Sequence, residues 1–460
     1  MGVATAAYQI EGATSAGGRG RSIWDTFTAQ PGRIADGSTG EVACDHYHRY
    51  PQDVALMAGL GIGAYRFSIA WPRIQPDGTG PAHPDGLGFY DRLVDALLEH
   101  GIDPVATLFH WDLPQALEDR GGWLNRDTAY RFAAYADLVA ARLGDRMKMW
   151  ITLNEPFVHM TFGYGLGVHA PGRAELFGAF PAAHHQLLGH GLATAALRAH
   201  GDVPVAITNN YSPVRLIGPE AGAGPGDAGP GDAGPGDAGP GDAEPGDAEP
   251  GDADRAAGEA YDALHNRLFT DPLFGRGYPD APGVDPAVVH DGDLAAIAAP
   301  LSALGVNYYN PTGVRAPGEG SPLPFELVPL ESYPTTSFGW PVVPDGLYDL
   351  LTGLRDRYGA DLPPVLVTEN GCAYDDEVDP AGRCEDPDRI AYLDGHLRAV
   401  ARAVADGVDV RGYFVWSLLD NFEWAEGYTK RFGLVHVDYA TQARTPKSSY
   451  AWYRDLVGRS

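Results

Sequence analysis

Short apolar runs rich in β-branched and aromatic residues alternate along the chain with longer stretches of helical periodicity. Eight runs have the length and composition of buried strands, and they span residues 2–8, 63–71, 103–111, 147–155, 203–210, 303–309, 364–370 and 411–419. The helical stretches between them include residues 51–61, 89–101, 129–144, 346–359 and 388–407. Strands that alternate with helices form parallel sheets covered by those helices. The pattern therefore predicts an α/β protein.

Eight strand–helix units are the number that a closed (β/α)8 barrel of the TIM type requires. We therefore predict a single barrel with elaborated βα loops over residues 1–460, with an open, doubly wound sheet as the alternative. A chain of 460 residues with 44% apolar residues is large enough to bury such a core.

One segment interrupts the alternation. Residues 224–253 repeat GPGDA four times and then EPGDA twice. Pro and Gly at this density do not continue a helix or a strand, and the segment offers no large apolar side chain to a core. We interpret it as a flexible, acidic surface loop inserted between the fifth and sixth strands. Calcium binding by its spaced aspartates is a less favoured alternative.

The chain carries a formal net charge of −28. Proteins that bind nucleic acids concentrate Lys and Arg on one face, and anionic membranes attract basic segments; the sequence contains no such basic run. The composition therefore argues against nucleic-acid and membrane partners and favours a neutral or cationic small molecule. It leaves the oligomeric state open.

The cysteines indicate the compartment. Cys44, Cys372 and Cys384 are too few for a disulfide framework, although Cys372 and Cys384 could pair across a short loop. The first residues show no signal-peptide pattern, and no apolar stretch has the length of a membrane-spanning helix. A cytoplasmic protein with reduced thiols is the simplest interpretation.

Polar and aromatic residues collect where the predicted strands end. In a barrel, these carboxyl ends form the face that carries active sites. The residues concerned are His110, Trp111 and Asp112 after the third strand, Asn154 and Glu155 after the fourth, Asn307, Tyr308 and Tyr309 after the sixth, Glu369 and Asn370 after the seventh, and Trp416, Asp420, Asn421, Phe422, Glu423 and Trp424 on and after the eighth, with Gln9 near the end of the first strand and Arg66 on the second. Packing alone does not require so many polar and aromatic residues at the strand ends.

Glu155 and Glu369 are the most informative pair. Each follows a run of β-branched residues and is placed at the rim with its carboxyl group over the barrel mouth. A single such Glu is more commonly a cap for the following helix. Two of them across one mouth favour glycoside hydrolysis, in which one carboxyl group is a proton donor and the other is ionised. Mutual repulsion and a partly apolar site would separate their pKa values in that sense.

The residues around this pair suit a sugar. Trp416 and Trp424 offer flat apolar faces to the C–H side of a pyranose, and Arg66 and Tyr309 are able to donate to one carboxylate and keep it ionised. Hydrogen bonds to hydroxyl groups would come from Gln9, His110, Asn154 and Glu423. Each residue alone is more commonly structural, and their joint position at the strand ends favours the functional interpretation.

Other motifs are weaker. His46 and His48 have a spacing compatible with zinc, but no further ligand stands beside them in the sequence, so we interpret them as structural and expect no metal. The adjacent His184 and His185 lie in a helical run and are interpreted as packing or solvated residues. The first strand is not followed by a GxGxxG motif, which indicates that no nucleotide cofactor is bound.

The longest motifs resemble glycoside hydrolase family 1, the β-glucosidase family. The resemblance covers nearly the whole chain outside the repeat. The segments that carry it are residues 2–13, 65–74, 107–117, 150–156, 304–309, 339–351, 367–371 and 412–439.

The resemblance implies a retaining mechanism without a cofactor, in which Glu155 matches the acid/base and Glu369 the nucleophile. It also implies carboxyl groups about 5 Å apart and a contact from Asn154 to the 2-hydroxyl. The remaining matches are Gln9, His110, Asn154, Glu423 and Trp424 around the non-reducing sugar, Trp416 beneath it, Arg66, Asn307 and Tyr309 around the nucleophile, and Trp340 on the leaving-group side.

Glu423 bears on the choice of substrate, because its carboxylate would bind free hydroxyl groups and repel a phosphate. We expect hydrolysis of cellobiose and of aryl or alkyl β-glucosides, with a 6-phospho-β-glycosidase as the alternative enzyme. In the family, an aromatic-rich stretch precedes the segment that starts here at Gly2. A shortened first strand is therefore expected, and a catalytically weak sugar-binding barrel is a further alternative.

Overall fold

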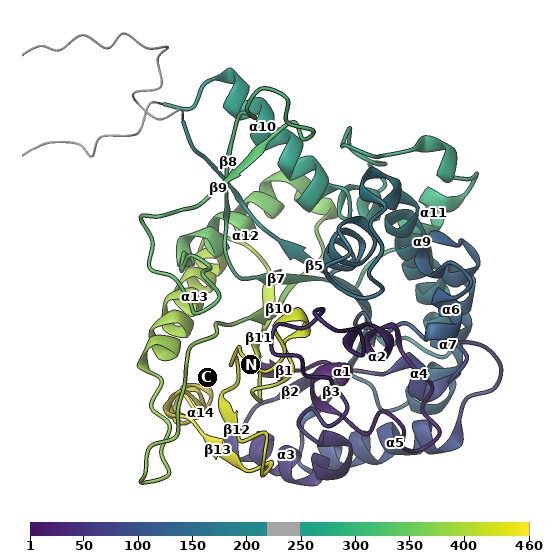
Figure 1. Cartoon of the computed structure of the whole chain (residues 1–460), viewed down its shortest axis with the longest axis vertical. Helices are drawn as coiled ribbons and strands as arrows, with labels where there is room; N and C mark the ends of the chain where they lie inside the picture. The colour runs from purple at the N-terminus through teal and green to yellow at the C-terminus, as the bar shows by residue number, and fades with distance from the viewer. Residues whose placement is uncertain (219–248, 460) are drawn as a thin grey trace, which may run out of the picture.

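Eight parallel strands close into a barrel (Figure 1). The structure is a computed structural model that describes residues 1–218 and 249–459. The barrel strands are β1 (Gly2–Ala4), β2 (Ala64–Ser68), β3 (Asp103–Phe109), β4 (Met149–Asn154), β5 (Val205–Tyr211), β7 (Ala303–Tyr308), β10 (Val365–Asn370) and β11 (Val410–Trp416). Strand β1 pairs in parallel with both β2 and β11 and so closes the ring. All eight predicted strands are thus present, the predicted barrel is confirmed, and the open-sheet alternative is wrong.

Long helices surround the barrel (Figure 1). They are α3 (His46–Leu60), α5 (Pro84–Glu99), α7 (Asp127–Leu143), α9 (Phe180–Arg198), α12 (Pro344–Tyr358), α13 (Pro387–Ala405) and α14 (Ser448–Val457). The five predicted helical stretches correspond to α3, α5, α7, α12 and α13. In α5, for example, Phe89, Tyr90, Leu93, Val94 and Leu97 are buried at helical spacing, which is the pattern of a helix packed on one face.

Shorter helices lie mainly in the βα connections. They are α1 (Ala7–Ile10), α2 (Ile23–Thr28), α4 (Trp71–Ile74), α6 (Gln115–Glu118), α8 (Pro156–Val158), α10 (Asp252–Asp262) and α11 (Asp293–Ile297). Single turns of 3₁₀ or π type are η1 (Gly122–Leu124), η2 (His159–Gly165), η3 (Leu176–Ala179), η4 (Ala263–Arg267), η5 (Asp271–Phe274), η6 (Pro286–Val288), η7 (Gly359–Asp361) and η8 (Trp424–Glu426).

Three predicted strands run at least three residues past the end of the observed strand, and one of them is the run over residues 63–71, in which β2 ends at Ser68 and Trp71 begins α4. The run over residues 2–8 leaves the ladder after Ala4, and Ala7 begins α1, so that Gln9 lies on a helical turn. The Ala7 amide there bonds the Ser68 hydroxyl at 2.7 Å instead of a strand partner. The run over residues 411–419 ends as a strand at Trp416, because the Ser417 amide bonds the carbonyl of Phe432 outside the barrel.

Two small sheets outside the barrel were not predicted. Strands β6 (Val214–Leu216), β8 (Thr312–Arg315) and β9 (Glu326–Val328) form one, and β12 (Val435–Val437) and β13 (Arg444–Pro446) form the other. Their strands have only three or four residues, which is too short for a period of two to be recognised. The first sheet packs against α10, beside the carboxyl ends of β5 and β7 (Figure 1).

Most of the predicted acidic loop, residues 224–253, lies outside the described residues. Its last five residues are described, and Asp252 and Ala253 already belong to α10. The loop prediction is therefore wrong at its C-terminal end. The Asp254 side chain accepts a hydrogen bond from the Gly251 amide at 2.9 Å and so starts the helix immediately after the last Pro-Gly pair.

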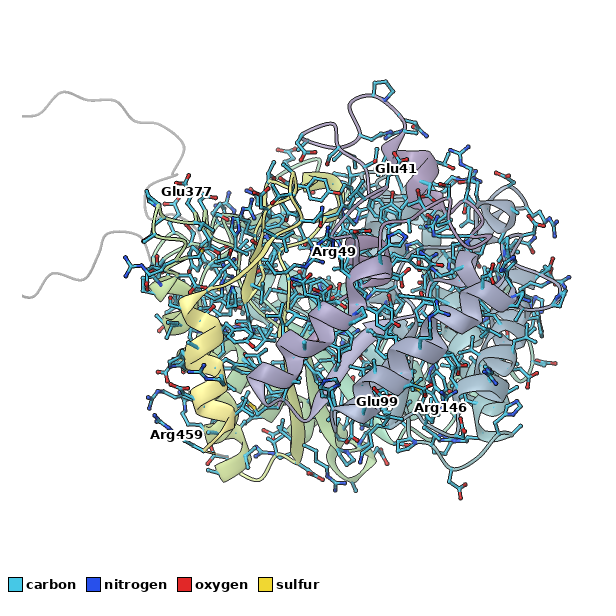
Figure 2. All side chains as sticks on the ribbon, turned by 90° about the horizontal axis from the view of Figure 1, so that it is seen from below. Glu41, Arg49, Glu99, Arg146, Glu377 and Arg459 are labelled. Carbon is cyan, nitrogen blue, oxygen red and sulfur yellow. The ribbon has the colours of Figure 1, made fainter. Side chains whose placement is uncertain are left out.

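Charged side chains lie mainly on the outside, as Glu41, Glu99 and Arg459 illustrate (Figure 2). Three arginines are exceptions and are among the largest fully buried side chains: Arg66, Arg73 and Arg389. Each is paired with a buried carboxylate, namely Glu369, Glu11 and Asp376. A buried charge requires such a partner, and Arg66 finds its partner at the carboxyl end of the barrel.

Candidate active site

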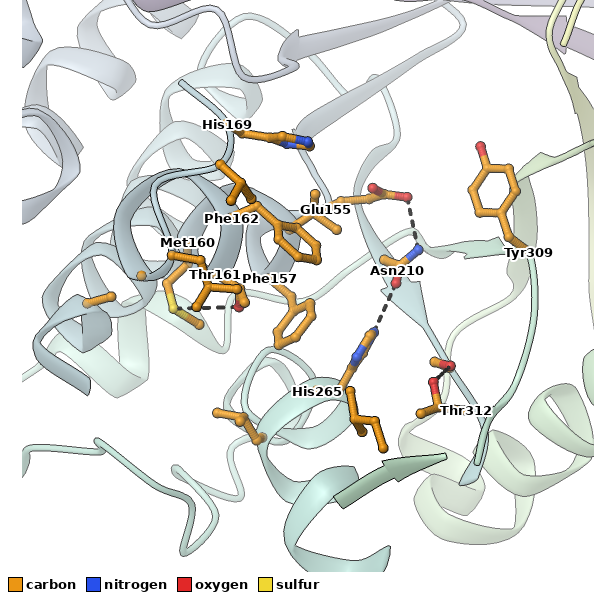
Figure 3. A pocket seen from close by; sticks show the side chains of 18 of the residues that line it. Glu155, Phe157, Met160, Thr161, Phe162, His169, Asn210, His265, Tyr309 and Thr312 are labelled. Carbon is orange, nitrogen blue, oxygen red and sulfur yellow. Dashed lines mark hydrogen bonds between the residues drawn. The ribbon is translucent and has the colours of Figure 1, made fainter. Parts of the chain in front are cut away.

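A cavity of about 940 Å³ opens at the carboxyl ends of the barrel strands (Figure 3). Strand register brings the polar strand-end residues side by side, since Asn307 of β7 pairs with Asn210 of β5 on one side and with Glu369 of β10 on the other. The predicted residues that line the cavity are His110, Glu155, Tyr309, Trp340, Glu369, Trp416, Glu423 and Trp424. Gln9, Arg66, Asn154 and Asn307 are not part of this lining; they are buried behind it and hydrogen-bond to residues that are.

Glu155 stands between β4 and α8 in the left-handed conformation, with φ 45° and ψ 60°. Pro156 disfavours the right-handed helical region for the residue before it, and the Glu155 amide is fixed on the Thr208 carbonyl of β5 at 2.8 Å. Oε1 accepts N–H bonds from Asn307 at 2.7 Å and from Asn210 at 3.3 Å. The second of these bonds is drawn in Figure 3. Because both donors reach the same oxygen, Oε2 is the oxygen that can carry a proton.

Glu369 is held differently, with a donor on each oxygen. Oε1 accepts from the Arg66 guanidinium at 2.5 Å, and Oε2 accepts from the Tyr309 hydroxyl at 2.7 Å. Both Arg66 and Glu369 are nearly inaccessible to solvent. Charge-assisted bonds of this kind stabilise the ionised carboxylate.

The two carboxyl groups therefore have different proton affinities. Burial, reinforced by the charge of Glu369, raises the pKa of Glu155 to about 8. Burial also raises the pKa of Glu369, but the Arg66 charge and the Tyr309 hydrogen bond oppose that shift. Glu155 is thus the protonated member of the pair at neutral pH and Glu369 the ionised one.

Polar groups with unused hydrogen-bonding capacity also lie at and just behind the cavity lining. Gln9 Nε2 donates to Glu423 Oε2 at 3.2 Å, while Gln9 Oε1 has no partner among the described residues. Burial, reinforced by Glu369 and Glu155, raises the pKa of Glu423 to about 8. Buried polar atoms without a partner are costly in a protein interior, so their presence here points to a polar ligand.

The tautomer of His110 follows from its neighbours. Asn154 Oδ1 accepts from Arg66 at 2.6 Å and from Asn307 at 3.1 Å, so its Nδ2 is the donor to His110 Nε2 at 2.9 Å. A neutral imidazole that accepts at Nε2 carries its hydrogen at Nδ1, which has no partner among the described residues. Burial and the Arg66 charge keep the pKa of His110 well below its ordinary value, so His110 offers one neutral N–H donor.

The aromatic residues of the cavity form two groups. Trp416 and Trp424 each lie against His110, with ring centroids 5.8 Å apart in both cases. Trp340 stacks on Phe338 at 4.2 Å and lies 5.3 Å from Tyr309 on the other side of the carboxyl pair. Such faces bind the C–H side of a sugar ring or an aromatic leaving group.

Backbone strain is concentrated at this cavity. Eight residues other than glycine have a positive φ in the described part of the chain, and half of them line the cavity: Trp111, Glu155, Leu176 and Trp424. Such conformations persist only where the surrounding structure holds them, and they cluster at functional sites.

Sequence reasoning missed several polar residues of the site, and two of them, Asn210 and His265, bear on Glu155. Asn210 bonds Glu155 and ends a predicted strand, so the strand-end signal used for the others was available for it. His265 bonds Asn210 from η4 at 2.9 Å, and its position inside a helical run gave no signal in the sequence. The apolar outer part of the cavity, between residues 160 and 180 and between 322 and 327, was likewise not predicted.

The weaker motifs lie elsewhere. His46 and His48 bond different carboxylates, Asp53 and Asp45, and His184 and His185 are both buried in α9. All three cysteines are buried free thiols, so Cys372 and Cys384 are not paired. No helix of the described residues is apolar enough over a sufficient length to cross a membrane.

A closed (β/α)8 barrel with one protonated and one ionised carboxyl group facing a sugar-sized, aromatic cavity defines a glycoside hydrolase. The family profile described as Glycosyl hydrolase family 1 matches residues 1–220 and 241–460. The chain therefore belongs to glycosyl hydrolase family 1, and it is a glycoside hydrolase.

Relatives cover the whole chain. It is 50% identical over 469 residues to the thermostable β-glucosidase B of Thermobispora bispora. The alignment covers 100% of this chain and 89% of that protein. The psychrophilic β-glucosidase BglU of Micrococcus antarcticus superposes with a TM-score of 0.88 at 46% identity, covering 100% of this chain and 96% of that one. The family 1 β-glucosidase of Thermotoga maritima in complex with isofagomine lactam superposes with a TM-score of 0.87 at 41% identity. The match covers 99% of this chain and 97% of that one.

Proposed function

We propose that the protein is a retaining β-glucosidase that releases terminal β-D-glucosyl residues from cellobiose and from aryl and alkyl β-glucosides. The observation that carries the proposal is the asymmetry of the carboxyl pair. Glu369 accepts bonds on both oxygens from Arg66 and Tyr309, whereas Glu155 bonds two neutral amides and, within the described part of the chain, no cation, so that Oε2 is free for a proton. The names of the relatives support the choice of β-glucosides.

Hydrolysis would proceed in two displacements. In the first, Glu369 attacks the anomeric carbon while Glu155 Oε2 gives its proton to the glycosidic oxygen, so that the alcohol leaves and a glucosyl ester of Glu369 forms. Esterification removes the charge of Glu369, and the proton affinity of Glu155 falls. In the second displacement, Glu155 takes a proton from water, whose oxygen attacks the anomeric carbon and returns Glu369 to a carboxylate. Two inversions retain the β configuration.

The roles proposed for the surrounding residues follow from their chemistry. Trp416 would lie beneath the sugar ring, and hydroxyl groups would be bound by Gln9, His110, Asn154, Glu423 and Trp424, with Asn154 at the 2-hydroxyl. Arg66, Asn307 and Tyr309 would orient the two carboxyl groups, and Trp340 would contact the leaving group.

The cavity argues against a phosphorylated sugar. Its lining includes four Glu residues and, among the described residues, neither Lys nor Arg. A phosphate bound beside Glu423 would have no cation to pair with. The 6-phospho-β-glycosidase alternative is therefore the less favoured one.

We further propose that residues 1–460 form one domain with the repeat as a surface insertion, and that the protein works in the cytoplasm. The family profile leaves residues 221–240 unmatched, and β6 and α10, on either side of the repeat, contact each other. The three buried free thiols are consistent with a reducing compartment.

The test is hydrolysis of 4-nitrophenyl β-glucoside, with the 6-phosphate and β-galactoside analogues as competitors. We expect glucose to appear first as the β-anomer by NMR, and Glu369→Gln to abolish release. Glu369→Ala with added azide should form the α-glucosyl azide. Release of the α-anomer by the unaltered protein, or preference for the 6-phosphate, would overturn the proposal, and a folded protein that releases no sugar would favour the sugar-binding barrel.

A further inference from the structure

The mouth of the cavity carries an unusual concentration of exposed apolar side chains. Eleven large apolar residues are exposed in the part of the chain that the structure describes, and five of them line this one cavity. We call these five the outer apolar wall: Leu166, Val168, Leu176, Phe177 and Leu327, with exposed fractions between 47% and 63%. Single exposed apolar residues are ordinary, whereas a group of them around one cavity marks a binding surface.

The wall is built from two separate connections of the barrel. Leu166 and Val168 follow η2 and, with Leu176 and Phe177 of η3, belong to the segment between β4 and α9. Leu327 is the central residue of β9, in the connection that follows β7. Leu176 has φ 50°, a conformation that leucine adopts only under constraint. The local fold thus holds this side chain at the mouth instead of turning it into the core.

The wall has little to offer a second sugar. A glucosyl unit in this position would need several hydrogen-bond partners for its hydroxyl groups, and the five wall residues have only apolar side chains. An apolar leaving group requires only area removed from water. Phe338 and Trp340, stacked on each other with ring centroids 4.2 Å apart, add further apolar surface to the same cavity.

We infer that the outer apolar wall selects β-glucosides whose leaving group is an extended apolar chain or ring system, in preference to cellobiose. The inference rests on the proposed function and specifies its substrate class. The inner residues then bind the glucosyl unit, and the wall binds the far end of the aglycone.

The experiment compares kcat/KM for octyl β-glucoside, held below its critical micelle concentration, with kcat/KM for methyl β-glucoside and cellobiose. The variant is the triple substitution Leu176→Ser, Phe177→Ser and Leu327→Ser. The matched control is Leu98→Ser with Val404→Ser, two exposed apolar residues that do not line the cavity. Thermal unfolding establishes that both variants fold.

We expect the unaltered protein to prefer octyl β-glucoside to cellobiose, and the triple variant to lose at least about tenfold in the octyl-to-methyl ratio while methyl β-glucoside is hydrolysed as before. The control should keep the original ratio. Cellobiose as the better substrate, or an unchanged ratio in the triple variant, would overturn the inference alone. Failure to hydrolyse any β-glucoside would instead overturn the proposed function and this inference with it.

A second, independent observation concerns a chain of hydrogen bonds behind Glu155 (Figure 3). Asn210 Oδ1 lies 2.9 Å from His265 Nε2, and His265 Nδ1 lies 2.8 Å from the Tyr261 hydroxyl. That hydroxyl lies 2.9 Å from Thr312 Oγ1. The His265 ring is buried and stacked on Phe157, with centroids 3.9 Å apart.

The bonds have one consistent direction. Asn210 Nδ2 donates to Glu155, so Asn210 Oδ1 is an acceptor and His265 must donate from Nε2. A neutral imidazole then accepts at Nδ1 from Tyr261. Burial lowers the pKa of His265 to about 3, which keeps the ring neutral as this arrangement requires.

We propose that His265 is a positioning residue for the acid/base, because its Nε2–H holds the Asn210 amide with the N–H side toward Glu155. If the amide turned over, its carbonyl oxygen would face Glu155 and favour the protonated acid. The other groups that face Glu155 are Glu369, Arg66, Tyr309 and Glu423, with the neutral rings of His110 and His169 in the same cavity. Among the described residues, the side-chain hydrogen bonds of the Asn210 amide go to Glu155 and His265, so His265 sets the orientation of this amide.

The test is the alkaline limb of the pH profile of kcat/KM, which follows deprotonation of Glu155. His265→Leu removes the donor and should move this limb upward by about half a pH unit. His265→Gln places an amide N–H near the Nε2 position and should restore the original limb. Tyr261→Phe, which keeps the ring but removes the donor to Nδ1, should shift the limb in the same direction and serves if His265→Leu does not fold.

If the alkaline limb of the pH profile keeps its original position in both His265→Leu and Tyr261→Phe, the proposal is overturned. An equal shift in His265→Gln and His265→Leu would also overturn it, because a merely structural role would not distinguish them.

Discussion

Glu155 and Glu369 are the same residue type at the ends of two barrel strands, and their partners separate their chemistry. A buried cation and a phenol bind Glu369, whereas two neutral amides bind one oxygen of Glu155. The charge of Glu369 is itself one of the causes that raise the pKa of Glu155. At the scale of single residues, the two carboxyl groups are therefore a linked pair.

The first prediction tests this linkage. Replacing Glu369 by Gln removes a nearby negative charge and leaves Arg66 unpaired, and both changes favour ionised Glu155. The pKa of Glu155 should fall from about 8 by about 1 unit or more. Titration of ¹³C-labelled glutamate side chains by NMR measures it, with Glu423→Gln as a comparison, and a pKa that does not move would contradict the linkage.

The second prediction concerns proton donation by Glu155. Glu155→Gln should lower kcat/KM for cellobiose by about 10²–10⁴-fold, the usual contribution of a general acid. The decrease in the rate of the first displacement should be much smaller for 2,4-dinitrophenyl β-glucoside, because its leaving group departs without a proton. Added azide should then give β-glucosyl azide, because it can attack the glucosyl enzyme without a general base. Equal losses for the two substrates would argue against Glu155 as the acid.

The sequence predicted those residues whose position follows from being at a strand end. Parallel strands end at one edge of the barrel, so Asn154, Asn307 and Glu369 had to lie together once the strands were recognised. His265 reaches Asn210 from η4, and no periodicity specifies which residue of a helical connection turns toward the mouth. The same holds for the outer apolar wall, because its residues lie in irregular segments where neither period applies.

At the scale of elements, the end of β11 carries Glu423 and Trp424 into the site through an irregular segment. Asp420 fixes that segment by accepting bonds from Lys447 at 2.8 Å, Arg431 at 2.8 Å and the Gly433 amide at 2.9 Å. Burial favours the protonated acid, but the charges of Lys447 and Arg431 outweigh it and keep the pKa of Asp420 below its ordinary value. The anchor is therefore ionic, and its Asp420 and Lys447 side chains are wholly buried.

The third prediction is that Asp420→Asn destabilises the fold by about 3–5 kcal/mol at pH 7, because Lys447 remains buried with one partner fewer. Because the pKa of Asp420 is lower in the folded than in the unfolded protein, ionised Asp420 stabilises the fold above about pH 4. This stabilisation is lost as the pH falls through the folded pKa. The difference in Tm between the original protein and the variant should thus shrink below pH 4. Asp409→Asn breaks an exposed pair with Arg411 and should leave Tm nearly unchanged; a similar loss there would contradict the argument.

The elements themselves were predictable to different degrees. All eight barrel strands were recognisable because a parallel strand buried on both faces is a continuous apolar run. The first, second and eighth runs extended too far, since Thr5 to Tyr8, Ile69 to Trp71 and Ser417 to Leu419 stay buried after leaving the ladder. An apolar run in the sequence indicates that the residues are buried, but it does not distinguish a buried strand from a buried turn.

At the scale of the whole molecule, the barrel and the repeat are separable. The family profile matches the residues on both sides of 221–240 and omits that segment. The two described flanks already meet, because α10 packs on β6 and Asp254 of α10 accepts a bond from the Ala316 amide beyond β8 at 2.9 Å. The contacts that define the site come from the barrel strands, from their other connections and, in the case of Tyr261 and His265, from the described part of this connection that follows the repeat.

The last prediction follows from this separation. Deleting residues 221–240 removes three aspartates and no large apolar side chain, and it leaves residues 217–220 and 241–251 to join β6 to α10. A loop that contributes nothing to the core has only a weak effect on stability through its length, so Tm should change by no more than about 2 °C. The value of kcat/KM for 4-nitrophenyl β-glucoside should stay within twofold of the original. Replacing the same segment by a Gly-Ser linker of equal length is the matched control, since it keeps the length and removes the sequence. A large loss of activity in the deletion but not in the linker variant would assign a role to the length of the insertion, and a loss in both would assign one to its sequence; either result would contradict the interpretation of the repeat as a passive surface loop.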